Sequence, residues 1–151
     1  MKKPQEDLDT VPLDAMVDGT PFSVLFSRAV KLKSAQEAHL RSKFESFPSF
    51  YQNSIFPREE VSKAREQDFE DRYKDGVRFK NLGNEKFKDL KYGDAIASYE
   101  MALAVFRYLV NTNPSWKNEG IKDDFIREER FETSSESEKC QVHEFLVVCY
   151  T

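Results

Sequence analysis

Cysteine is scarce in this sequence, and long apolar runs are missing from it. The two cysteines, Cys140 and Cys149, have no CxxC spacing and no second pair, so they indicate neither a disulfide framework nor a zinc site. The longest apolar run, Phe145 to Tyr150, is far too short to cross a bilayer. The N-terminus passes from two lysines directly into acidic residues and lacks the apolar stretch of a secretory signal. We therefore expect a reduced, cytoplasmic protein without a membrane partner.

An excess of positive charge is also missing. The chain has 23 basic and 27 acidic residues, which give a formal net charge of −4. Binding to a nucleic-acid backbone depends on clustered lysine and arginine, and no basic face stands out in this sequence. We expect no nucleic-acid partner.

The motifs of common enzymes and metal sites are absent as well. The sequence contains no glycine-rich phosphate loop, no HExxH and no nucleophile elbow. His39 and His143 lie on separate segments without matched ligands, and the pair Asp123-Asp124 shows no sign of the burial that tunes a catalytic pKa. We expect no enzyme activity, no catalytic residue, no metal and no cofactor.

Charged and aromatic residues are plentiful instead. Charged residues make up 33% of the chain and there are only five glycines and six prolines, which favours one soluble, mainly helical domain. Thirteen phenylalanines and six tyrosines are many for so polar a chain. Either the core is rich in aromatic rings or some rings await a partner, and the composition leaves both open.

The most specific pattern lies between residues 80 and 103. Two helices pack closely only where one of them offers glycine or alanine to a bulky side chain of the other. The spacing predicts one helix ending near Leu90, a turn at "LKYGD" and a second helix that continues through Val110. The small residues of this predicted seam are Gly83, Ala95 and Ala102, and the large ones are Leu82, Phe87, Ile96 and Tyr99.

This pattern resembles the tetratricopeptide repeat (TPR), a helix-turn-helix unit of about 34 residues. Phe79 departs from the usual tryptophan, and Arg107 stands where a proline is common. The resemblance implies an all-α fold, with a TPR-type antiparallel helical hairpin and an N-terminal helical extension; the alternative is an unrelated hairpin with an alanine and glycine seam. The five matching packing positions are Leu82, Gly83, Ala95, Tyr99 and Ala102.

The rest of the chain is divided around this hairpin. We expect a helix over residues 21–44, a turn-rich aromatic segment after it, and then either one long charged helix or two with a break at Asp75-Gly76. We expect the final segment to be the first helix of a second repeat that is incomplete in this sequence. The predicted divisions are a disordered acidic tail at 1–19, an aromatic-rich helical extension at 20–56, a long helix and the hairpin at 57–110, an acidic inserted loop at 111–138 and the first helix of an incomplete second TPR at 139–151.

Lys80 and Asn84 are four residues apart and therefore lie on one face of the predicted helix. A lysine and an asparagine that project together can hold a carboxylate, one by charge and the other by directional hydrogen bonds. The string "KNLGNEKFK" resembles the carboxylate-clamp class of tetratricopeptide domains, which bind acidic EEVD tails of Hsp90 and Hsp70. The resemblance implies that Lys80 and Asn84 bind the peptide carboxylate and that Phe87 and Lys88 contribute more weakly to the groove.

The resemblance covers two of the five clamp positions, because the sequence stops at the third and lacks the repeat that carries the others. We expect a protein-interaction module of a co-chaperone for the Hsp90 or Hsp70 tail. The alternative is a TPR scaffold that binds another protein through residues 20–56, with Lys80 a solvated bystander. A repeat face containing Phe145, Val148 and Tyr150 would be uncovered, which predicts marginal stability or self-association.

Overall fold

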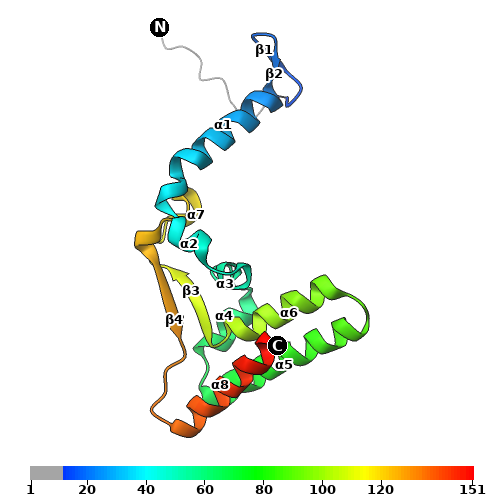
Figure 1. The fold of residues 1–151 in the computed structure, drawn as a ribbon, viewed down its shortest axis with the longest axis vertical. Coiled ribbons are helices and arrows are strands. Elements are labelled where there is room, and N and C mark those ends of the chain that lie inside the picture. The colour runs from blue at the N-terminus through cyan, green and yellow to red at the C-terminus, as the bar shows by residue number, and fades with distance from the viewer. Residues whose placement is uncertain (1–11) are drawn as a thin grey trace. The chain divides into compact units, whose positions relative to one another are not determined.

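The computed structural model describes residues 12–151 and is mostly helical, with two short pairs of strands (Figure 1). It divides into two compact units, the first ending at Leu40 and the second beginning at Arg41. The predicted predominance of helix is confirmed. Within the described residues, no helix combines the length and the apolar composition needed to span a bilayer.

The first unit consists of a small β-hairpin and a helix. Strands β1 (Met16–Val17) and β2 (Thr20–Pro21) pair antiparallel. Asp18 and Gly19 between them both have positive φ, 47° and 77°, a turn geometry that favours Asp-Gly. The prediction of disorder over 1–19 is therefore wrong for residues 12–19, while residues 1–11 lie outside the described residues.

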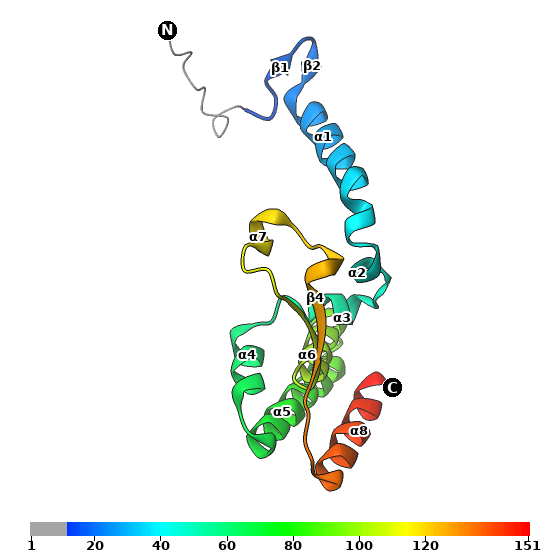
Figure 2. The ribbon, with the colours of Figure 1, turned by 90° about the vertical axis from the view of Figure 1, so that its left-hand side faces the viewer.

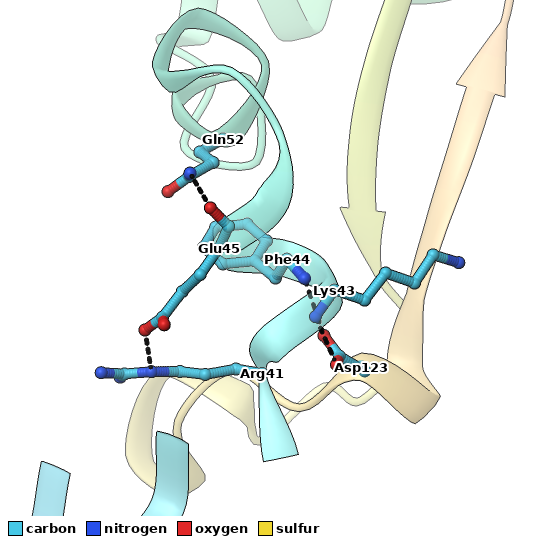
Figure 3. Close-up of polar contacts among 6 residues, drawn as sticks. All are labelled: Arg41, Lys43, Phe44, Glu45, Gln52 and Asp123. Atoms are coloured by element: carbon cyan, nitrogen blue, oxygen red, sulfur yellow. Dashed lines mark hydrogen bonds and ion pairs between the residues drawn. The ribbon is translucent and has the colours of Figure 1, made fainter. Parts of the chain in front are cut away.

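Helix α1 (Phe22–Glu37) follows directly, continues into the 3-10 turn η2 (Ala38–Leu40), and buries none of its side chains. The predicted helix over 21–44 is too long, because Phe44 belongs to a separate helix of the second unit, α2 (Ser42–Ser46). The Asp123 carboxylate accepts hydrogen bonds of 2.8 Å from the backbone N–H groups of Lys43 and Phe44 (Figure 3). Asp123 thus satisfies first-turn donors that lack partners within α2.

The aromatic segment after α2 contains a short helix, α3 (Ser49–Asn53), where the sequence predicted none. Rings of this segment pack into the core of the second unit, which confirms the interpretation that the core is rich in aromatic rings. The buried cluster around them consists of Phe44, Tyr51, Ile55, Leu109 and Ile126.

Three further helices form the centre of the second unit: α4 (Glu59–Glu66), α5 (Phe69–Lys88) and α6 (Tyr92–Ala104). The chain breaks before Asp68, whose carboxylate accepts a 3.1 Å hydrogen bond from the N–H of Asp71 and caps α5. The alternative break at Asp75-Gly76 is wrong. A Cβ atom on Gly76 would lie 3.0 Å from the ring of Phe106 and 3.2 Å from that of Phe145, so this glycine admits two core rings instead of bending the helix.

Helices α5 and α6 form an antiparallel hairpin (Figure 1). At its seam a Cβ atom on Gly83 would lie 2.6 Å from the ring of Tyr99, so only glycine allows this approach. Ala95 and Ala102 are buried as expected. Leu82, Phe87 and Ile96 are not part of the buried seam, since they are 36%, 56% and 58% exposed. Successive helix positions point in different directions, and Leu82 precedes the buried Gly83 by one position.

Helix α6 ends at Ala104 and does not continue through Val110. The chain enters strand β3 (Arg107–Asn111), which pairs antiparallel with β4 (Ile126–Arg130). Leu109 is buried at the centre of β3, and its N–H donates a 2.8 Å hydrogen bond to Ser54 Oγ. Strand pairing therefore overrides the helical spacing of the local sequence.

The predicted inserted loop at 111–138 is largely structured. Between β3 and β4 lie the short helix α7 (Trp116–Glu119) and the 3-10 turn η3 (Asp123–Phe125) (Figure 2). The final helix, α8 (Glu136–Tyr150), starts earlier than the predicted 139 because Ser135 Oγ accepts a 3.3 Å hydrogen bond from the N–H of Glu138. The Ser-x-x-Glu spacing of a capping box was present in the sequence.

Helix α8 packs on the hairpin through Phe145, with Val142, Leu146 and Cys149 packed beside it. Phe145 is buried, and its ring centroid lies 5.5 Å from that of Phe106 and 5.6 Å from that of Tyr73. The expectation that Phe145 lies on an uncovered face is therefore wrong. Val148 and Tyr150 do remain exposed.

Candidate carboxylate-binding groove

A groove lies where the C-terminal end of α8 faces α5, and it encloses about 530 Å³. We call it the α5–α8 groove. Helix α8 is held there by Phe145, which packs against side chains of α5 and against Phe106. The residues lining it are Lys80, Asn84, Phe87, Tyr99, Val148, Cys149, Tyr150 and Thr151.

The two predicted carboxylate-binding residues lie together in this groove. Lys80 is half-buried and Asn84 is exposed, one turn apart on α5. Phe87 also lines the groove, with 56% of its surface exposed, and its ring contacts Tyr92 at a centroid distance of 5.3 Å. Lys88 is exposed and is not among the lining residues.

The amide of Asn84 is oriented by its neighbour on α6. The Tyr99 hydroxyl donates a 2.7 Å hydrogen bond to Asn84 Oδ1. An amide whose oxygen accepts this bond presents its Nδ2 group, with two N–H donors, on the other side. No hydrogen bond within residues 12–151 uses that group, so Asn84 is positioned to donate to a ligand oxygen. Tyr99 was predicted for packing only; its hydroxyl contact adds a role that the spacing did not indicate.

The charge of the groove favours an anion. No aspartate or glutamate side chain lines it, although the chain has 27 acidic residues. Lys80 forms no ion pair with any residue of the described part of the chain. Its ammonium group is thus available to a ligand carboxylate, in a half-buried position where water screens the attraction less than at an open surface.

The pKa of the Cys149 thiol reflects its position in the groove. Burial raises the pKa of the Cys149 thiol to about 11, and the positive charge of Lys80 lowers it by a smaller amount. The thiol is therefore protonated at neutral pH, which makes it a poor nucleophile.

We expect Cys149 to be alkylated slowly by iodoacetamide, at a rate that rises with pH until the pH approaches about 11. Lys80→Met should slow the reaction further, because it removes the charge that stabilises the thiolate. Mass spectrometry of the Cys140→Ser variant measures this rate, since Cys140 is the exposed cysteine. Rapid alkylation at pH 7 in the folded protein would contradict the burial of this thiol.

The wall contributed by α8 was missed in the sequence. The spacing of Val142, Phe145, Leu146 and Cys149 predicted the helix, but it did not indicate that residues 148–151 would face Lys80.

The described residues contain no group of three or more histidine, cysteine, aspartate or glutamate side chains that could hold a metal. Comparison with known protein families, curated proteins and solved structures found no match to this chain.

Proposed function

We propose that the α5–α8 groove binds the acidic C-terminal tail of a protein partner. The observation that carries this proposal is that Lys80 and Asn84 share one groove without an acidic side chain among its lining residues. In this proposal the hairpin is a TPR-type unit, and the chain acts as an interaction module of a co-chaperone that binds the EEVD tail of Hsp90 or Hsp70.

Each side chain has a separate task in the proposed complex. The Lys80 ammonium supplies charge to the terminal carboxylate, and the Asn84 Nδ2 group supplies directional hydrogen bonds. The apolar surfaces of Phe87, Val148 and Tyr150 offer contact to the aliphatic side chain that precedes the last residue of such a tail. The close contact of Gly83 with Tyr99 supports the repeat assignment, because a small residue receiving an aromatic ring is what that pattern predicts.

The alternative proposal, a scaffold that binds through aromatic residues of 20–56, has weaker support. Phe44 and Tyr51 are buried in the second unit, and Phe47 and Phe50 pack against them. Phe26 and Phe56, which are 55% and 59% exposed, are the rings of this segment that a partner could contact.

Isothermal titration calorimetry with two peptides tests the proposal. One peptide ends in Glu-Glu-Val-Asp with a free carboxylate, and the other has the same sequence with a C-terminal amide. We expect the free acid to bind at least tenfold more tightly, because a charge-assisted hydrogen bond contributes about 1.5–3 kcal/mol. Equal affinities, or no binding of either peptide, would contradict recognition of a terminal carboxylate.

A further inference from the structure

Strand β4 pairs with β3 along one of its edges. Just beyond one end of this ladder the N–H of Thr112 donates a 2.8 Å hydrogen bond to the carbonyl oxygen of Phe125. Beyond the other end the N–H of Phe131 donates a 2.8 Å hydrogen bond to that of Phe106. Bonded pairs alternate along an antiparallel ladder, so every second residue of β4 directs its backbone N–H and C=O groups away from β3. The residues that do so are Ile126, Glu128 and Arg130.

The outer edge of β4 is open. On the outer edge of β3 the N–H of Leu109 is satisfied, because it donates a 2.8 Å hydrogen bond to Ser54 Oγ. The outward N–H groups of β4 have no hydrogen-bond acceptor among the described residues. In Figure 1, β3 lies on one side of β4 and no described element of the second unit runs along the other side. Such an edge is a template to which a further strand can add by backbone hydrogen bonds.

Two charged side chains of β4 lack a partner of opposite charge. Arg127 and Glu129 are two residues apart, so they lie on the same face of the strand. Neither forms an ion pair with any described residue. Charges on an edge strand normally hinder the addition of another strand. A strand that presents the opposite charges in register removes this obstacle and pairs selectively.

We propose that β4 pairs antiparallel with β4 of a second copy of this chain, along an edge separate from the α5–α8 groove. In a symmetric register centred on Glu128, Ile126 lies opposite Arg130 of the second copy, so the outward backbone groups of the two strands meet. Arg127 then lies opposite Glu129 of the second copy, and the reciprocal contact is identical. These two contacts are non-hydrogen-bonded pairs, in which opposing side chains lie closest.

The centre of this register brings two copies of Glu128 together. Each carboxylate is already compensated within its own copy. It accepts a 3.1 Å hydrogen bond from the Tyr51 hydroxyl and lies 3.4 Å from Nη2 of Arg107 and 3.6 Å from Nη2 of Arg130. The repulsion at the centre is therefore weak compared with the attraction of the two flanking contacts between Arg127 and Glu129.

Sedimentation velocity over a range of protein concentrations tests this pairing. We expect the unmodified chain to dimerise reversibly. Arg127→Glu should weaken dimerisation by about tenfold or more, because carboxylates then oppose each other at both flanking contacts. The double variant Arg127→Glu, Glu129→Arg exchanges the charges and should restore the dimer. Arg28→Glu is the matched control, since Arg28 is exposed on α1 and its reversal makes the same change in net charge as Arg127→Glu.

Mixing the two single variants gives a sharper result. Arg127→Glu leaves only acidic side chains at the flanking contacts, and Glu129→Arg leaves only basic ones. Each variant should therefore dimerise weakly alone, whereas an equimolar mixture should form heterodimers with complementary charges at both contacts. Circular dichroism of each variant should match that of the unmodified chain, because neither side chain has an ion-pair partner among the described residues.

Amide hydrogen exchange at low and high protein concentration locates the contact. Dimerisation should slow exchange at Ile126, Glu128 and Arg130, whose N–H groups face outward. The proposal is overturned if the unmodified chain remains monomeric at every concentration, or if Arg127→Glu dimerises as strongly as Arg28→Glu. Slowed exchange confined to Val148 and Tyr150, which are exposed on α8, would also overturn it, because the copies would then meet through a different surface.

Discussion

Lys80→Glu is expected to abolish binding of the acidic peptide while leaving the helix content unchanged. The substitution removes the ammonium group and places a carboxylate in a groove that has no acidic side chain. Loss of the charge-assisted contact alone weakens binding roughly tenfold to a hundredfold, and the new repulsion adds to this. Calorimetry with the Glu-Glu-Val-Asp peptide measures the affinity, and far-ultraviolet circular dichroism measures the helix content.

Lys117→Glu provides the control for this substitution. Lys117 is exposed on α7 and does not line the groove, so its reversal makes the same change in net charge without touching the proposed site. The affinity of this variant should stay within about twofold of the unmodified chain, as expected for a screened surface charge. An unchanged affinity in Lys80→Glu would disprove the role of Lys80.

Phe106→Ala is expected to have the largest effect on stability. Phe106 is 1% exposed, and its ring lies 5.5 Å from that of Phe145, 6.1 Å from that of Phe131 and 6.2 Å from that of Tyr73. Truncating a buried phenylalanine removes its apolar surface from the core and leaves a cavity, which lowers the free energy of unfolding by about 3–5 kcal/mol. Urea unfolding followed by circular dichroism measures this loss.

Phe26→Ala is the matched control, because Phe26 is 55% exposed on α1. Its free energy of unfolding should change by less than about 0.5 kcal/mol. A loss below about 1 kcal/mol in Phe106→Ala would mean that α8 is not packed on the hairpin through this ring cluster. In that case the α5–α8 groove would lack its second wall.

The hairpin was predictable because its determinants are local. Gly83 and Ala95 lie twelve residues apart, and the short turn between their helices brings them into register with few alternatives. The juxtaposition of Lys80 and Asn84 was predictable for the same reason, since they share a face of any helix that contains them.

Contacts between distant segments explain why the predicted helix boundaries differ from the observed ones. Asp123 caps α2 from about 80 residues away, so the end of α1 and the start of α2 could not be read from local spacing. Leu109 has the spacing of a continuing helix, but pairing of β3 with β4 draws it into the aromatic cluster. Gly76 matches a helix break in its local sequence, but it accommodates the rings of Phe106 and Phe145, which come from distant parts of the chain.

The wall that α8 adds to the groove depends on the same tertiary contacts. The sequence predicts an amphipathic final helix with Phe145 on an uncovered repeat face. Once Phe145 packs against Tyr73, the last turn of α8 faces Lys80, and the groove acquires its apolar side. The juxtaposition of Lys80 and Asn84 was thus a local prediction, whereas the groove that contains them depends on contacts between distant segments.

A two-dimensional amide NMR spectrum, recorded with and without the Glu-Glu-Val-Asp peptide, shows whether the α5–α8 groove binds an acidic tail. We expect dispersed peaks, with peptide-induced shifts centred on Lys80, Asn84 and residues 148–151. Dispersed peaks that do not respond to the peptide, or shifts confined to residues 20–56, would contradict it.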